Sequence, residues 1–188
     1  MKIYFPGTVV ERNNKSSREF LSGLFFATKG LMLAQVREIT GLDKTTIQNW
    51  SNRGWIRKTV DKRYAIDNLA GIMLINMLRD VMKIESIVSL FSYINGDIDD
   101  ESDNIVSESD LYNYICDILD IAEFKTLFDD KNLSRLINNE ISDYHEPFEG
   151  AKDKLVNAIK IILVYYASAI IKREADKIYS NIIIKGEK

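Results

Sequence analysis

The sequence is poor in residues on which many enzymes and disulfide-stabilised proteins depend. It holds one cysteine, one histidine and two prolines among 188 residues. A single cysteine excludes an internal disulfide framework and fits a reducing cytoplasm. Two prolines and nine glycines favour long helices over a turn-rich all-β fold. The composition therefore predicts a helical protein of the cytoplasm.

Motifs for catalysis and for membrane insertion are also missing. No P-loop, GxGxxG, GxSxG, HExxH or CxxC pattern occurs. His145 stands in the acidic segment "DYHEPFE", and Cys116 falls on an apolar helix face, where a small buried side chain is expected. The N-terminus lacks the apolar run of a signal peptide. The most apolar stretch, 155–171, contains Lys160 and is shorter than the roughly 20 residues of a membrane span. We predict neither an enzyme nor a membrane protein, and no cofactor.

The net charge of −3 conceals an uneven distribution along the chain. Residues 1–64 hold 12 Lys and Arg against 5 Asp and Glu, a net charge of +7. Residues 92–149 hold 3 against 16, a net charge of −13. A basic first third beside an acidic middle is typical of a protein that meets phosphate groups with one end only.

The chain is organised around residues 32–55, "MLAQVREITGLDKTTIQNWSNRGW". Its apolar spacing predicts two short helices joined by a tight turn, each burying one face. Gly41 suits the turn, where a positive φ or a close helix approach favours glycine. Asp43 is placed to cap the second helix and Gly54 to end it. The side chains predicted to face inward are Val36, Ile39, Leu42, Ile47 and Trp50.

The opposite face of the second helix carries only hydrogen-bonding side chains. Amides can read adenine through two hydrogen bonds in the major groove. A merely solvated surface is the alternative, although Glu and Lys are the more usual residues there. No acid occurs between Lys44 and Val60 that would repel phosphate. The residues predicted to bind DNA on this face and its flanks are Lys44, Thr45, Gln48, Asn49, Asn52 and Arg53.

A basic segment, "IRKTVDKRYAIDNLA", follows from Ile56. Val60 and Asp61 fit a turn between two short extended pieces, which would form a small β-wing. Its cations suit phosphate contacts, which position a protein and make its binding salt-dependent. A charged hairpin that only keeps an edge soluble is the alternative. The residues predicted to contact DNA here are Arg57, Lys58, Lys62, Arg63 and the adjoining Tyr64.

Three stretches together resemble the DNA-binding half of MerR-type regulators: "LAQVREITGLDKTTIQNWSNRGWI", "DKRYAIDNLAGIMLINMLRD" and "KIESIVSLFSYING". The shared order is a helix-turn-helix, a wing with a basic-Tyr pair, and two helices. From about Gly30 to Cys116 the chain is more closely similar to an uncharacterised bacterial family, the domain of unknown function 1836 family. That family brings no assigned function with it.

The MerR resemblance implies a dimer that binds promoter DNA through the second helix and the wing. The contacts that it implies are Thr45, Gln48, Asn49, Arg57, Lys62, Arg63 and Tyr64. In one respect this chain departs from the pattern. MerR-type proteins usually carry an Arg-Tyr-Tyr run where this chain has Gln48-Asn49-Trp50. We expect Arg53 or Arg37 to supply the missing phosphate anchor.

Capping patterns and apolar spacing predict the remaining helices. Ser16 and Glu19 form a capping box that opens a helix ending at Gly30, and Ser107 with Asp110 opens another. The further helices expected are an amphipathic one at 66–82 and others at 84–94, 107–124, 132–141 and, with Pro147 in its opening turn, up to about residue 183.

The predicted fold is therefore all-α with a small β-wing. It comprises an N-terminal arm and helix (1–30), a winged helix-turn-helix domain (31–96), an acidic linker (97–106) and a helical C-terminal domain (107–188). Asp97, Asp99 and Glu101 resemble part of a calcium loop, but Ser102 stands where its glycine belongs, so a solvated linker without metal is expected. The apolar last helix either pairs two subunits or forms the core of a monomer.

These features together predict a transcriptional regulator that binds double-stranded DNA as a homodimer. One alternative is a helix-turn-helix reused as a protein-protein interaction module, with the acidic segment in place of phosphate. A further alternative is a regulator gated by an unidentified small-molecule effector, bound among the C-terminal helices.

Overall fold

The computed structural model of the protein describes residues 3–96 and 103–184. Within those ranges the chain is mostly helical, and its β-type pairing is limited to three isolated bridges. The predicted all-α class is confirmed. The helices are α1 (Ser17–Phe25), α2 (Leu33–Thr40), α3 (Lys44–Asn52), α4 (Ile66–Leu78), α5 (Ile84–Asn95), α6 (Glu108–Ile121), the 3₁₀ helix η1 (Phe124–Phe128), α7 (Asp130–Glu140), α8 (Ala151–Tyr179) and a π-helical turn η2 (Ser180–Ile184).

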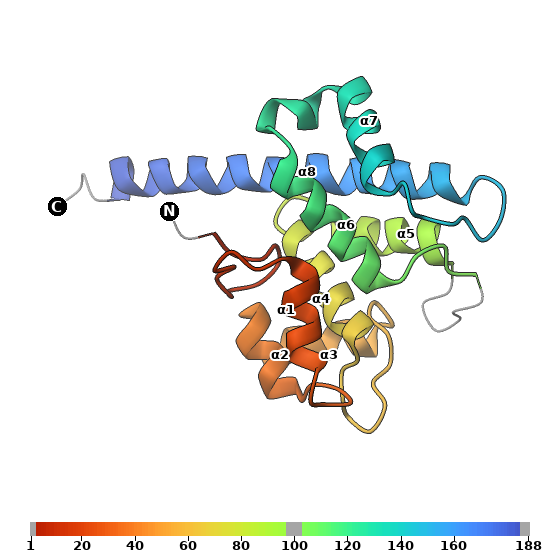
Figure 1. The fold of residues 1–188 in the computed structure, drawn as a ribbon. Coiled ribbons are helices and arrows are strands. Elements are labelled where there is room, and N and C mark those ends of the chain that lie inside the picture. Colours follow the sequence, from red (N-terminus) through yellow and green to blue (C-terminus); the bar gives the residue numbers. More distant parts are fainter. Residues whose placement is uncertain (1–2, 97–102, 185–188) are drawn as a thin grey trace.

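Helix α4 lies at the centre of the molecule and packs against α2, α5, α6 and α8 (Figure 1). Its residues from Asn68 to Ile75 are all buried. The expectation of an amphipathic helix is therefore wrong, because a helix that is apolar on every side must be covered on every side. The helix also ends at Leu78 rather than Met82. The chain then makes one further turn, in which the amides of Val81 and Met82 both donate to the Leu78 carbonyl.

Helix α8 packs across α4, α5 and α6 and continues beyond them toward the C-terminus (Figure 1). It begins at Ala151, after Gly150 in the left-handed conformation with φ +85°. The prediction that Pro147 lies in its opening turn is wrong, because Pro147 lies in the exposed loop before that glycine. From Ile171 to Ile183 every side chain of α8 and η2 is exposed.

The segment Ala151–Ile183 is long and apolar enough to cross a membrane by length and composition alone. Within its most apolar window, 44% is buried inside the protein. The core helix of a soluble protein passes the same test, and α8 packs against four other α-helices. The helix is therefore compatible with a soluble protein.

The N-terminal segment packs against the helices that follow it. Ser16 and Glu19 form the predicted capping box of α1, but the helix ends at Phe25 and not at Gly30. Before it, the chain folds back on itself through a bridge between Tyr4 and Glu11. The buried ring of Phe5 stacks on Phe20 of α1 with 4.2 Å between centroids.

The predicted wing is a tight hairpin turn rather than a pair of strands. Asp61 and Lys62 adopt φ values of +51° and +59°, and the Arg63 amide donates to the Val60 carbonyl at 2.9 Å. The turn is therefore centred one residue later than the predicted Val60-Asp61 pair. At the base of the hairpin, Leu31 and Tyr64 exchange two backbone hydrogen bonds of 2.8 and 2.9 Å.

One hydrophobic core joins residues from both sides of the predicted boundary between the two domains. Of the predicted linker, residues 97–102 lie outside the described residues, and with them Asp97, Asp99, Glu101 and Ser102 of the calcium-loop comparison. The described end of the linker is anchored. Asn95 donates to the Val106 carbonyl at 2.7 Å, and its own side-chain oxygen accepts from the Ile105 amide at 3.2 Å.

Candidate nucleic-acid interface

Helices α2 and α3 are held in a helix-turn-helix arrangement by local features of the sequence. Gly41 ends α2 with φ +71°, and a Cβ there would lie 2.7 Å from Val9 Cγ1. Asp43 caps α3 by accepting from the amide and hydroxyl of Thr46 at 2.8 and 2.7 Å. The hydrogen bonds from Thr46 lower the pKa of Asp43. The predicted inward residues Val36, Ile39, Leu42, Ile47 and Trp50 are all buried.

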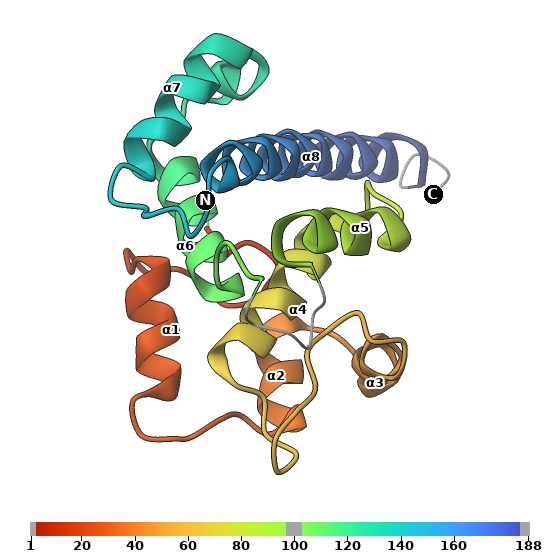
Figure 2. The same cartoon turned by 90° about the vertical axis from the view of Figure 1, so that its right-hand side faces the viewer.

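The outer face of α3 carries the side chains that its helical spacing predicts. Five residues of this face are exposed and make no side-chain hydrogen bond to other described residues. With Ile47 and Trp50 fixed in the core, this polar face is held outward at the edge of the molecule (Figure 2). We call these residues the α3 face: Lys44, Thr45, Gln48, Asn49 and Asn52.

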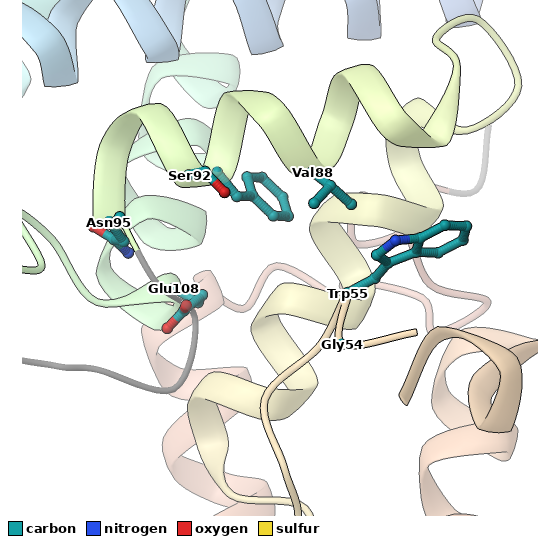
Figure 3. A pocket seen from close by; sticks show the side chains of 8 residues that line it. Gly54, Trp55, Val88, Ser92, Asn95 and Glu108 are labelled. Carbon is teal, nitrogen blue, oxygen red and sulfur yellow. The ribbon is translucent and has the colours of Figure 1, made fainter. Parts of the chain in front are cut away.

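Two arginines outside the α3 face were predicted as phosphate anchors. Arg53 follows α3 directly, and its guanidinium lies over the indole of Trp55, 4.8 Å from the ring centroid. Trp55 is itself positioned by a hydrogen bond of 2.9 Å from its amide to the Trp50 carbonyl. The indole also borders a cavity against α5 (Figure 3). Arg37 lies on the exposed side of α2, so both arginines predicted as phosphate anchors are accessible.

The hairpin presents further cations near its tip. Lys58, Lys62 and Arg63 are exposed. The Arg63 guanidinium donates to the Gly30 carbonyl at 3.1 Å, which ties its side chain to the segment before α2. The hairpin itself is fixed to α4, because the Asn68 amide donates to the Arg57 carbonyl at 2.8 Å.

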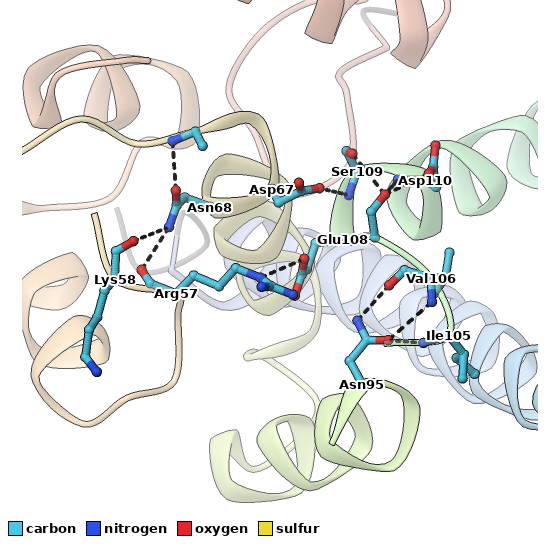
Figure 4. Close-up of polar contacts among 12 residues, drawn as sticks. Arg57, Lys58, Asp67, Asn68, Asn95, Ile105, Val106, Glu108, Ser109 and Asp110 are labelled. Carbon is cyan, nitrogen blue, oxygen red and sulfur yellow. Dashed lines mark hydrogen bonds and ion pairs between the residues drawn. The ribbon is translucent and has the colours of Figure 1, made fainter. Parts of the chain in front are cut away.

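Two residues predicted to contact DNA point into the protein instead. Arg57 donates through Nε to both carboxylate oxygens of Glu108 at 3.0 and 3.1 Å (Figure 4). The two side chains are only 12% and 13% exposed. Tyr64 is 7% exposed, and burial raises the pKa of its hydroxyl. Arg57 and Tyr64 therefore fix the hairpin in place rather than offer an exposed contact.

The described part of the acidic segment leaves the α3 face open. Helix α6 packs against α1, α4, α7 and α8. Its first residue, Glu108, approaches the hairpin through Arg57, while the neighbouring Asp67 of α4 accepts from the Ser109 amide at 2.9 Å. Burial raises the pKa of Glu108, and the nearby Arg57 opposes this rise. Arg57, which the sequence predicts as a DNA contact, is therefore paired with Glu108 and not exposed, and this pair covers none of the α3 face.

Sequence reasoning missed the partnership between Arg57 and Glu108. The sequence indicates only that Glu108 is an acidic residue in the first turn of a capped helix. Fifty-one positions separate the two residues, so no local spacing pattern connects them. The only available signal was the coexistence of a basic segment and an acidic segment in one chain.

The fold and this exposed face define a helical protein with an accessible helix-turn-helix. Residues 25–115 match the family described as "Domain of unknown function (DUF1836)", which confirms that part of the sequence resemblance. An "Uncharacterized protein YkrK" of Bacillus subtilis (strain 168) is 24% identical over 162 residues, covering 80% of this chain and 69% of that protein. No solved structure matches the chain.

Proposed function

We propose that this protein is a cytoplasmic transcriptional regulator that binds double-stranded DNA as a homodimer through a MerR-like winged helix-turn-helix. The observation that carries the proposal is the α3 face. It combines one cation, one hydroxyl and three side-chain amides, two of them adjacent, and it has no acidic residue. The opposite face of the same helix is buried in the core. A helix of this width fits the major groove.

Each part of the interface has a distinct role in the proposal. Gln48 and Asn49 read base edges, because their amides offer a donor and an acceptor to adenine. Lys44 and Arg53, at the two ends of α3, neutralise phosphates and set the position of the helix along the groove. The tip of the hairpin, with Lys62 and Arg63, contacts the backbone as a wing.

Helix α8 provides the surface that pairs two subunits. Ile161, Val164, Ile171 and Ile178 are between 39% and 57% exposed. Together with Ser168 and Ala175 they follow alternating steps of three and four residues, which is the spacing of a two-stranded coiled-coil seam. Pairing along this stripe would bury apolar side chains that the monomer leaves in water, and it would present two α3 faces to one duplex.

Fluorescence anisotropy with a labelled duplex pool, titrated across salt concentrations, tests the proposal. If Lys44, Arg53, Lys62 and Arg63 of both subunits contact phosphates, a plot of log affinity against log salt concentration should have a slope of about −7. Lys44→Gln should make the slope shallower by about 1 per subunit. The matched control, Lys131→Gln, removes an exposed lysine of α7 and should leave the slope unchanged.

The same titration separates the proposal from its rival. If the protein does not bind duplex at low salt, or if its affinity does not change with salt concentration, DNA binding is contradicted. Either result favours a helix-turn-helix that binds protein. The ion pair between Arg57 and Glu108 is an example of such a contact within this protein, because a protein carboxylate there binds a cation of the hairpin.

A further inference from the structure

A cavity of about 330 Å³ lies between α5 and the loop that follows α3 (Figure 3). Its size reaches the lower end of the range typical of small-molecule sites, about 300 Å³. Trp55, Val88 and Phe91 supply apolar surface, and Trp55 lies on the opposite side from Glu108. Ser92 of α5 borders the space between them. The cavity therefore has an aromatic end and a polar end.

The polar end can accept hydrogen bonds from a ligand. Asn95 also borders the cavity, but its amide already holds the backbone of Ile105 and Val106. The Glu108 carboxylate accepts from Arg57 Nε, and a carboxylate has lone pairs for about four such bonds.

The charge around this end favours a cation. Asp67 accepts a hydrogen bond from the amide of Ser109, the residue after Glu108, so the carboxylates of Asp67 and Glu108 both lie near the guanidinium of Arg57. A ligand that brings one positive charge would balance this set, whereas a ligand carboxylate would add a third negative charge.

We propose that this cavity binds a small aromatic molecule that carries one ammonium or amidinium group, with its ring beside Trp55 and Phe91 and its cation at Glu108. The ring would gain contact with aromatic and aliphatic surface, and the cation would gain a charge-assisted hydrogen bond in a largely desolvated place. The site lies between the helix-turn-helix, α5 and the first residue of α6, so it borders the C-terminal domain in which the sequence suggested an effector only at Glu108.

The position of the cavity also gives the ligand a route to the DNA interface. The indole of Trp55 lines the cavity and carries the guanidinium of Arg53. A ring packed against Trp55 would shift or fix that indole, and with it the cation at the end of α3. This regulatory consequence rests on the proposed DNA binding, while ligand binding itself does not.

The test uses tryptamine as the probe and tryptophol, which replaces the amine with a hydroxyl, as its neutral counterpart. The chain has two tryptophans, so a ¹⁵N-labelled sample gives two indole resonances. Tryptamine should shift the resonance of Trp55 with a Kd on the order of 1 mM, while that of the buried Trp50 moves little. Tryptophol should bind at least about tenfold more weakly.

Two variants localise the effect. Ser92→Phe fills the cavity and should abolish the tryptamine shift, whereas Ser89→Phe adds the same ring to α5 outside the cavity and should preserve it. Glu108→Gln should bring the affinity for tryptamine down to that for tryptophol. Ser92 is exposed, so the Phe variants keep the test valid if Glu108→Gln unfolds.

A Trp55 resonance that stays fixed at 10 mM tryptamine (about ten times the expected Kd) overturns the proposed site, as does equal binding of tryptamine and tryptophol. These measurements contain no DNA, so they succeed or fail independently of the proposed function. A tryptamine shift that is present while duplex binding is absent would retain the site and remove only its regulatory role.

Discussion

The buried pair of Arg57 and Glu108 predicts a large and non-additive effect on stability. Arg57→Met leaves the Glu108 carboxylate, 13% exposed, without the Arg57 cation, and Glu108→Gln removes the carboxylate that accepts from Nε of Arg57, a side chain 12% exposed. Removing one partner of a buried pair costs about 3–5 kcal/mol, and the residual exposure places this pair near the lower end, at about 3 kcal/mol. The double variant should lose much less than the sum.

Urea denaturation followed by circular dichroism measures these changes. With a slope of about 2 kcal/mol per molar urea, each single variant should unfold about 1.5 M earlier than the wild type. A coupling energy of at least about 1.5 kcal/mol is expected from the double-mutant cycle. Additive losses, or single losses below about 1 kcal/mol, would refute the view that this pair fixes the hairpin to α6.

The pH dependence of the same variant provides a second check. Burial raises the pKa of Glu108 in the folded state, so the folded protein binds this proton more tightly than the unfolded chain. Its contribution to stability is complete below the unfolded pKa and is lost as pH rises through the folded pKa. Arg57→Met removes the cation that opposes the rise. Its cost in unfolding free energy should therefore shrink toward acidic pH, where Glu108 is neutral, and a cost that grows there would contradict this assignment.

Three further predictions concern other parts of the chain. Gly41→Ala should lower the unfolding free energy by about 1–2 kcal/mol, because φ at this position is +71° and the new Cβ would contact Val9. Gly23→Ala, in the middle of α1 with open space around it, should stabilise the protein by about 0.5–1 kcal/mol. Equal effects of the two variants in urea denaturation would argue against the turn. Burial raises the pKa of the Cys116 thiol to about 12. At pH 8 a disulfide reagent should therefore label this thiol at least about 100-fold more slowly in the folded protein than in the urea-unfolded protein. Rapid labelling of the native state would contradict the burial of Cys116. Ile171→Glu should convert dimers to monomers in sedimentation velocity, while Ile121→Glu, also on an exposed isoleucine, should not. A wild-type protein that stays monomeric at about 100 µM, where pairing would be weaker than about −5.5 kcal/mol, would remove α8 as the pairing surface.

The helix-turn-helix could be read from the sequence because its determinants are local. The capping carboxylate of Asp43 lies three residues from the amide it binds, and Gly41 adopts the left-handed conformation that the turn demands. The spacing of Ile47 and Trp50 fixes which side of α3 is buried and therefore which side is exposed. Such short-range rules do not depend on the rest of the fold.

Features that depend on tertiary packing could not be read in this way. The basic residues of the hairpin were equivalent in sequence, yet Arg57 faces a carboxylate of α6 while Lys62 faces solvent. Helix α4 has polar residues at Asn68 and Asn76 that suggest a wet side, but Asn76 donates to the carbonyls of Gly7 and Thr40. The cavity beside Trp55 likewise exists only because α5 returns to the end of α3.

Selection of bound duplexes from a random pool tests the central claim most directly. The wild-type protein should enrich a two-part sequence whose halves are separated by the spacing of the two α3 helices in a dimer. Gln48→Ala combined with Asn49→Ala should retain salt-dependent binding but lose the enriched bases, whereas Asn138→Ala with Asn139→Ala on α7 should select the wild-type sequence. Enrichment that survives unchanged in the Gln48 and Asn49 variant, or no enrichment by the wild type, would contradict the assignment of α3 as the helix that reads DNA.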